Sequence, residues 1–224
     1  MPPKTKTPPK SVLIVDDHPM MRTGLAQLID NEPDLKVRAE ADNAGQALDA
    51  VTKQPFDLIL LDISLPDKNG LELIKDIQTL QPGQRILVVS MHDELLYAER
   101  VLRAGGRGYI MKQEGGKKFL QAIRQVLSGQ IYVSDKISAR ILENVSGRHN
   151  EASASPIERL TDREFEVFQL IGQGKSTRDI AQHLRLSMKT VEVHRSNIKK
   201  KLKLKTATDL VSHAIRWVES GQKG

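Results

Sequence analysis

The sequence predicts a doubly wound α/β domain with a five-stranded parallel sheet, followed by a small all-α domain of four helices. In the first half of the chain, short apolar runs alternate with segments whose apolar residues recur with the period of a helix. In the last third, helix-start signals follow one another at short intervals, and all of the excess positive charge lies there. Together these three observations predict two domains of different architecture.

The strands of the first domain are expected at short apolar runs. A parallel strand is buried on both faces, so it reads as a continuous apolar run. Right-handed crossovers between such strands place helices on both faces of the sheet. The expected strands are Val12–Val15, Lys36–Ala41, Leu58–Leu61, Ile86–Val89 and Gly108–Ile110. They are interleaved with stretches of helical period, such as Met20–Ile29, Leu71–Leu80 and Phe119–Leu127, which makes five strand-helix units.

Composition along the chain sets the expected domain boundaries. After the α/β domain, Val133–Val145 can form one helix, but residues 146–156 are mostly small and polar and have nothing to bury. The expected divisions are a disordered basic tail (1–10), the α/β domain (11–129), a partly helical linker (130–156) and a helical domain (157–220).

Charge and composition narrow the classes of function. Up to Ser155 the chain has 20 Lys and Arg and 20 Asp and Glu, whereas the rest has 14 and 8, so the net charge of +6 belongs to the helical domain. A basic domain joined to a neutral one is typical of proteins that bind a polyanion, although a solvated lysine-rich surface is the alternative. The absence of cysteine excludes disulfides and thiol chemistry. Without a membrane-spanning run or a signal peptide, the chain is expected to be soluble and cytoplasmic, with no membrane partner.

The helices of the second domain are each preceded by a capping signal. A serine or threonine followed three residues later by an acidic residue satisfies free N–H groups at a helix start. The signals are Thr161 with Glu164, Ser176 with Asp179, Ser187, and Thr206 with Asp209. The second and third helices are separated by only a few residues, which is typical of a helix-turn-helix.

Acidic residues follow two of the expected strands. Asp16 and Asp17 come after the first strand and Asp62 after the third, so that adjacent strands would bring three carboxylates to one edge of the sheet. Carboxylates this close raise one another's pKa unless a cation intervenes, and Mg²⁺ is the hard divalent ion that we expect there. In the alternative interpretation, Asp16 and Asp17 cap the first helix and Asp62 caps a loop.

Two further groups follow the fourth and fifth strands. Ser90 closes the fourth strand and Lys112 follows the fifth. Aspartyl phosphorylation requires a nucleophilic carboxylate, cations that neutralise the phosphoryl oxygens, and a hydroxyl that hydrogen-bonds the product. The set of residues therefore favours phosphoryl transfer to an aspartate.

Four separated motifs resemble those of a receiver domain with a flavodoxin-like fold, in order and spacing. They are Val15–Asp17, Leu61–Gly70, Val89–Ser90 and Tyr109–Lys112, although Gln113 stands where many receivers have proline. The resemblance implies that Asp62 is the phosphoacceptor and that Lys112 contacts the phosphoryl group. It also implies Mg²⁺ ligation by Asp17, Asp62 and the Ser64 backbone carbonyl, with Asp16 acting through water. Ser90 and Tyr109 would form the switch pair.

The candidate recognition helix begins after Ser187 and has two different faces. Val191, His194, Ile198 and Leu202 form a flank suited to packing, and the opposite face carries cations and small polar groups that fit the DNA major groove. The candidate DNA contacts are Thr177, Arg178, Ser187, Lys189, Thr190, Glu192, Val193, Arg195, Ser196, Lys199 and Lys200. Among them, Glu192, Val193 and Ser196 are the expected base readers.

Residues 160–214 resemble the LuxR-type helix-turn-helix, on the motifs Leu160–Glu164, Thr190–Arg195 and Lys201–Leu202. With the receiver-like domain in front, the chain resembles the NarL/FixJ subfamily of two-component response regulators. This resemblance implies a transcription regulator that a sensor histidine kinase phosphorylates, with phosphorylation promoting homodimerisation and promoter binding. The last helix could form the dimer contact or pack within its own domain.

Two other functions stay open at this stage. The first is an enzyme that transfers phosphoryl groups of a small substrate through Asp62, but Ser64 occupies the position where an aspartate-nucleophile hydrolase has its acid or base. The second is a DNA-binding protein that has lost its switch. We expect a protein that is not an enzyme and only gains and loses its own phosphoryl group.

Overall fold

The computed structural model describes residues 8–145, 156–184 and 186–221. The chain divides into two compact units, Met1–Leu142 and Glu143–Gly224. Most of the expected N-terminal tail (1–7) and of the polar linker segment (146–155) lies outside the described residues. Lys10, expected in the tail, instead begins the first strand, where it pairs with Leu35 and with the carboxylate of Asp57 at 2.9 Å.

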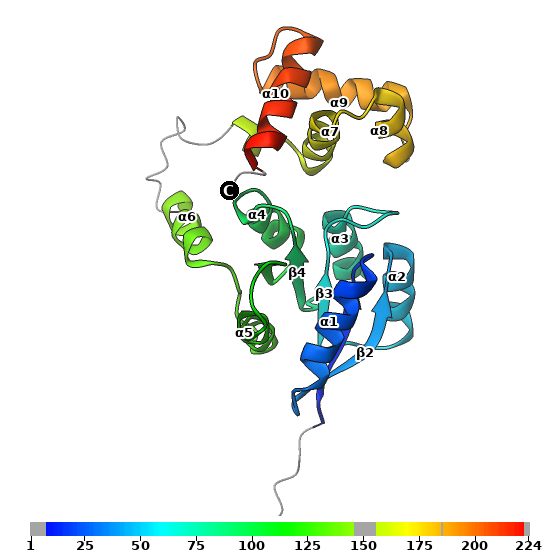
Figure 1. The fold of residues 1–224 in the computed structure, drawn as a ribbon, viewed down its shortest axis with the longest axis vertical. Coiled ribbons are helices and arrows are strands. Elements are labelled where there is room, and N and C mark those ends of the chain that lie inside the picture. Colours follow the sequence, from blue (N-terminus) through cyan, green and yellow to red (C-terminus); the bar gives the residue numbers. More distant parts are fainter. Residues whose placement is uncertain (1–7, 146–155, 185, 222–224) are drawn as a thin grey trace, which may run out of the picture. The chain divides into compact units, whose positions relative to one another are not determined.

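A single parallel sheet forms the centre of the first unit. Within the described residues it has five strands, in the order β2-β1-β3-β4-β5, which confirms the predicted doubly wound fold (Figure 1). The strands are β1 (Lys10–Val15), β2 (Leu35–Ala41), β3 (Leu58–Leu61), β4 (Ile86–Ser90) and β5 (Gly108–Met111). The strand order reverses its direction at β1 and β3, and in such sheets ligands bind at the carboxyl ends of the strands beside this reversal.

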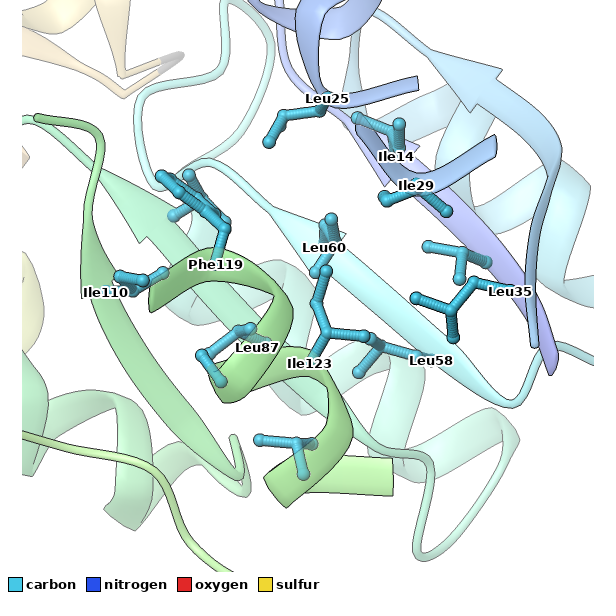
Figure 2. Packing of buried hydrophobic residues seen from close by; sticks show 14 residues of the cluster. Ile14, Leu25, Ile29, Leu35, Leu58, Leu60, Leu87, Ile110, Phe119 and Ile123 are labelled. Atoms are coloured by element: carbon cyan, nitrogen blue, oxygen red, sulfur yellow. The ribbon is translucent and has the colours of Figure 1, made fainter. Parts of the chain in front are cut away.

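Helices cover both faces of this sheet. They are α1 (Pro19–Asp30), α2 (Ala44–Lys53), α3 (Gly70–Leu80), α4 (Glu94–Ala104) and α5 (Gly116–Leu127). On one face, Leu25 and Ile29 of α1 and Phe119 and Ile123 of α5 pack over residues of the strands, such as Leu60 (Figure 2). In β1, β3 and β4, the alternate apolar positions, which point to the other face, are also buried. The prediction of apolar runs buried on both faces is therefore confirmed for Val12–Val15, Leu58–Leu61 and Ile86–Val89, whereas the edge strand β2 is only partly buried.

Helices α2 and α4 lie in the second and fourth of the five predicted strand-helix units, where no helix bounds were predicted. The buried residues of α2 are Ala44, Ala47 and Val51, and two of the four buried residues of α4 are alanine. Both helices therefore bury small side chains as well as larger ones against the rest of the unit.

The segment that follows α5 is hydrogen-bonded to the sheet. The backbone N–H of Tyr109 donates to the carbonyl of Tyr132 at 2.9 Å, and the N–H of Tyr132 donates to the carbonyl of Arg107 at 3.0 Å. Helix α6 (Asp135–Val145) comes next, and the Ser134 hydroxyl at its start donates to Glu94 of α4 at 2.8 Å. The beginning of the expected linker thus packs on the first unit.

The second unit is helical, as predicted. After a short 3₁₀ turn, η1 (Pro156–Arg159), it contains α7 (Asp162–Gly172), α8 (Thr177–His183), α9 (Met188–Lys201) and α10 (Ala207–Gly221). Capping boxes at Thr161 and Ser176 are confirmed, and the pair Thr206 and Asp209 caps α10 in the same way. Gly174 has a φ of 77°, the left-handed conformation that ends a helix and suits glycine.

Aromatic side chains form the centre of the helical unit. The rings of Phe165 and Trp217 meet edge to face with centroids 5.4 Å apart, and Phe168 lies 5.6 Å from the same tryptophan. These contacts join α7 to α10, and α8 and α9 pack against α7. Over the described part of the chain, no helix is long and apolar enough to cross a membrane.

Candidate metal centre and nucleic-acid interface

Acidic side chains gather at the carboxyl ends of β1 and β3. The backbone continues the strand pattern past the last strand residues, since the N–H of Asp62 donates to the carbonyl of Val15 at 2.8 Å. Asp16, Asp17, His18 and Asp62 each offer a ligand atom, and these atoms lie within 4.8 Å of one another. The structure thus brings together the three carboxylates that the sequence singled out. His18 was not predicted, because a lone histidine before a helix carries no recognisable pattern.

Lys112 lies between two of these carboxylates. Its Nζ is 2.7 Å from Oδ2 of Asp16 and 2.8 Å from Oδ2 of Asp62, and its side chain is only 6% exposed. Burial alone would lower the pKa of Lys112, but the two carboxylates outweigh this effect and raise it. The lysine is therefore a fixed positive charge at the centre of the site.

Asp62 is a carboxylate whose charge is incompletely compensated. Burial raises its pKa above the ordinary value, and the negative charge of Asp16 adds to this, against the opposing effects of Lys112 and of the Ser64 N–H. Three carboxylates share the neighbourhood of one lysine, and the His18 ring, 2.7 Å from Asp17 and 3.1 Å from Asp16, is largely exposed. A set of carboxylate oxygens with excess negative charge fits a hard divalent cation such as Mg²⁺.

The β3–α3 loop is held close against Asp62. The Ser64 N–H donates to Oδ1 of Asp62 at 3.3 Å. A Cβ atom at Gly70 would lie 2.6 Å from the Cα of Ile63 and 2.8 Å from the Asp62 carbonyl oxygen, so only glycine fits there without displacement. Asp67 accepts hydrogen bonds from the N–H groups of the first two residues of α2, at 2.8 and 3.0 Å. The loop is therefore tied at several points on both sides of the acidic cluster.

Ser90 and Tyr109, the predicted switch pair, are both buried. Ser90 is fully buried and Tyr109 is 1% exposed, with its hydroxyl donating to the His92 carbonyl at 2.7 Å. Burial raises the pKa of Tyr109, so that it stays a neutral donor. His92 connects this pair to the loop after Asp62, because its N–H donates to the Ser90 hydroxyl at 3.2 Å and its Nε2 lies 2.8 Å from the Ser64 hydroxyl.

Sequence reasoning missed His92, for a physical reason. Its ring stacks on Tyr97 with centroids 4.9 Å apart, and burial together with the charge of Lys112 lowers the pKa of His92, which favours the neutral ring. These contacts come from three separate segments of the chain. No local pattern around His92 could have signalled them.

Helix α9 has the two faces that the sequence predicts. Val191 and Ile198 are fully buried and Leu202 is 9% exposed, and half-buried His194 lies on the same packing flank. On the opposite face, Val193 is 52% exposed although it is apolar. The candidate contacts Arg178, Ser187, Lys189, Glu192, Ser196 and Lys200 are exposed, and Thr177, Thr190, Arg195 and Lys199 are half-buried. The Ser187 hydroxyl is also engaged as the N-cap of α9, accepting from the Thr190 N–H at 3.0 Å.

Comparison with protein families gives one match for each unit. Residues 12–124 match the response regulator receiver domain, and residues 158–214 match the bacterial regulatory proteins of the luxR family. Among curated proteins, the oxygen regulatory protein NreC of Staphylococcus haemolyticus is 34% identical over 209 residues, which cover 92% of this chain and 96% of the relative. NreC of Staphylococcus epidermidis is 32% identical over 210 residues, with the same coverage.

Solved structures agree with these matches. A LuxR-family two-component response regulator from Aurantimonas is 32% identical, with a TM-score of 0.57, and covers 62% of this chain and 99% of its own. RcsB of Salmonella typhimurium has a TM-score of 0.71 over 94% of this chain and 98% of its own, and at 24% identity it supports the fold alone. Another structure shows RcsB of Salmonella enterica serovar Typhimurium bound to the promoter rprA with the phosphomimetic BeF3-, at 23% identity and a TM-score of 0.68 over 92% and 98% of the two chains.

Proposed function

The chain belongs to the two-component response regulators with a LuxR-type DNA-binding domain, and we propose that transfer of a phosphoryl group to Asp62 switches it. It is a phosphorylation-dependent transcription regulator of a two-component system. The observation that carries the proposal is the position of Lys112, buried between Asp16 and Asp62 at an acidic sheet edge. This arrangement keeps a positive charge beside a carboxylate whose pKa is raised by burial and by Asp16.

Each side chain of the site has a proposed role. The Asp62 carboxylate attacks phosphorus as the bond from phosphorus to the donor breaks, so that the kinase histidine or, from acetyl phosphate, acetate leaves. The Lys112 ammonium binds an oxygen of the transferred group. Asp17, Asp62 and the Ser64 carbonyl would hold Mg²⁺ directly, and Asp16 would hold it through water. When bound, Mg²⁺ neutralises charge on the phosphoryl oxygens. The Ser90 hydroxyl then hydrogen-bonds the aspartyl phosphate, and Tyr109, which is already inside, keeps the β4–α4 loop in the matching conformation.

The partners follow from this chemistry. We expect a sensor histidine kinase as the phosphoryl donor, double-stranded promoter DNA as the ligand of the helical unit, and a homodimer when the protein is phosphorylated or bound to DNA. A regulator of this kind needs access to the chromosome, so we expect it in the cytoplasm. Support for a protein that only modifies itself comes from Ser64, which offers no acid or base two residues after Asp62.

Acetyl phosphate with Mg²⁺ tests the switch directly. The wild-type protein is expected to form an acid-stable, base-labile acyl phosphate, and Asp62→Ala is expected to form none. Asp49→Asn, which changes an exposed aspartate on α2, is the matched control and is expected to react like the wild type. Steady turnover of a small phosphoester would instead favour an enzyme, and equal DNA mobility shifts for phosphorylated and unphosphorylated protein would favour a DNA-binding protein without a switch.

Salt dependence tests the DNA contacts of α9. We propose that Thr177, Arg178, Ser187, Lys189, Thr190, Glu192, Val193, Arg195, Ser196, Lys199 and Lys200 lie at the DNA. Lys189→Ala and Lys199→Ala are expected to weaken binding to all sequences and to reduce the slope of log K against log salt by roughly one each. Titration of labelled duplex at several salt concentrations measures the slope, and an unchanged slope would exclude the phosphate contact of that lysine.

A further inference from the structure

Three side chains connect the start of α8 to the exposed face of α9. The Thr177 hydroxyl donates to Oε1 of Glu192 at 2.9 Å. Arg195 approaches the same hydroxyl with Nη1 at 3.4 Å, and its Nε lies 3.6 Å from Oε1 of Glu192. Thr177, Glu192 and Arg195 thus form a closed triangle, which we call the α8–α9 triad.

Burial within the triad is uneven. The Arg195 side chain is 15% exposed, although it lies beside the face that we expect to meet DNA, whereas the Glu192 side chain is 59% exposed. A buried guanidinium keeps a fixed orientation when a carboxylate and a hydroxyl contact it. Glu192 and Thr177 therefore determine where Arg195 points.

The charge of Glu192 also needs an explanation on a surface that faces phosphates. An unpaired carboxylate there is repelled by the DNA backbone, and it favours binding only where it accepts a hydrogen bond from cytosine N4. In the α8–α9 triad, Oε1 of Glu192 already meets both Thr177 and Arg195. Pairing within the protein thus reduces the repulsion and engages one of the two oxygens that could otherwise read a base.

We propose that Glu192 is a positioning residue, which holds Arg195 and the start of α8 in place for DNA binding and selects no base pair itself. This inference rests on the proposed function of the helical unit, and it replaces the sequence-based expectation that Glu192 reads a base. A released Arg195 still attracts phosphates, but its direction is lost. Removal of the Glu192 carboxylate therefore strengthens binding to unrelated DNA and weakens the preference for the correct site at all positions together.

Selection from a random duplex library tests the inference with the full-length protein, treated with acetyl phosphate and Mg²⁺. Glu192→Gln is compared with the wild type and with Glu219→Gln, which removes one negative charge from an exposed position of α10. For Glu192→Gln we expect the ratio of specific to non-specific affinity to fall about tenfold, which corresponds to one charge-assisted hydrogen bond. The ranking of bases at every position is expected to stay as in the wild type, and Glu219→Gln is expected to keep the ratio.

The other triad residues provide the second readout. Thr177→Ser keeps the hydroxyl and is expected to preserve the affinity ratio, whereas Thr177→Val is expected to lower it. Arg195→Lys combined with Glu192→Gln is expected to be no worse than Arg195→Lys alone, because Glu192 acts through Arg195. Additive losses would overturn the inference.

The outcomes separate the inference from the function on which it rests. Loss of preference at a single base pair in Glu192→Gln, with the other positions intact, would show that Glu192 reads a base and would overturn the inference alone. A wild-type protein that selects no sequence from the library would overturn the DNA-binding function and the inference with it.

Discussion

Each unit of the molecule buries a carboxylate against a lysine, yet the pKa of the two carboxylates moves in opposite directions. Asp62 is 3% exposed and lies 2.8 Å from Lys112, and its pKa is raised. Glu164 is 4% exposed and lies 2.6 Å from Lys201, and its pKa is lowered. Burial against a lysine therefore does not by itself determine the state of a carboxylate.

The difference lies in the other neighbours. Asp62 shares its lysine with Asp16, so that burial and a second negative charge outweigh the ion pair. Burial also disfavours the charge of Glu164, but Lys201 and the N–H of Thr161, which donates at 2.8 Å, outweigh it. Glu164 is thus a satisfied structural group, whereas Asp62 keeps a charge that a cation can relieve.

Removal of each lysine is expected to give the largest difference between the two pairs. Lys112→Ala leaves two buried carboxylates without their cation and is expected to lower the free energy of unfolding by about 3 kcal/mol or more. Lys201→Ala is expected to cost about 1 kcal/mol, because Lys201 is 35% exposed and water replaces part of its contact. Urea unfolding without Mg²⁺ measures both. Circular dichroism follows the whole chain, and fluorescence of Trp217, the single tryptophan, follows the helical unit.

The control for this prediction is the unit that is not mutated. Lys112→Ala is expected to leave the Trp217 transition unchanged, and Lys201→Ala is expected to shift it. Equal losses for the two lysines would contradict the view that Asp62 and Asp16 depend on a single shared cation.

Neutralisation of Asp62 is expected to stabilise the first unit. The pKa of Asp62 is higher in the folded state than its ordinary value of 3.8. Ionisation of Asp62 therefore lowers the free energy of unfolding as the pH rises through the pKa of the folded state, and this cost is absent below pH 3.8. Asp62→Asn is therefore expected to gain on the order of 1 kcal/mol at neutral pH without Mg²⁺. Urea unfolding at several pH values should show this gain disappear in acid, with Asp49→Asn as the unaffected control. A loss of stability at neutral pH would mean that Lys112 fully compensates Asp62.

Lowering the pH is expected to destabilise the helical unit through Glu164, whereas it removes the cost of the Asp62 charge in the first unit. The lowered pKa of Glu164 contributes stability that is present above the ordinary value of 4.5 and is lost as pH falls through the lower value of the folded state. Glu164→Gln is expected to cost about 1 kcal/mol at neutral pH and to flatten the acid dependence of the Trp217 transition. Glu219→Gln, on the exposed face of α10, is expected to keep the wild-type dependence.

The capping boxes of the helical unit and the acidic site of the first unit could both be predicted from the sequence. The capping signals at Thr161, Ser176 and Ser187 are local, so the sequence located the starts of their helices to the residue. The acidic site depends on strand adjacency, and a parallel order with β1 beside β3 was enough to bring Asp16 and Asp62 together. Both features can be predicted because helix capping and strand adjacency depend on backbone geometry.

What the sequence could not predict depends on how side chains meet across elements. His92 gains its role from Ser64 and Tyr109, which are 28 and 17 residues away along the chain, and nothing near His92 indicates these partners. Glu192 reads as an exposed acidic residue on a helix, and only the approach of α8 to α9 shows that Thr177 engages it. Such contacts depend on the packing of helices, which a one-dimensional pattern does not specify.

The two capping boxes at α7 and α8 differ in burial, so they test whether burial changes the contribution of a cap to stability. At α7, Thr161 caps a helix whose third residue is the buried Glu164, held also by Lys201, whereas at α8 Ser176 pairs with Asp179 in water. Thr161→Ala is expected to cost about 1 kcal/mol in the Trp217 transition, since it removes one partner of a network that is largely out of water. Ser176→Ala is expected to cost clearly less, because water takes the place of the hydroxyl and Asp179 still accepts from the N–H of residue 176. If the two substitutions cost the same, burial of Glu164 adds nothing to its cap, and the pKa difference between the two units would have to arise at Asp62 alone.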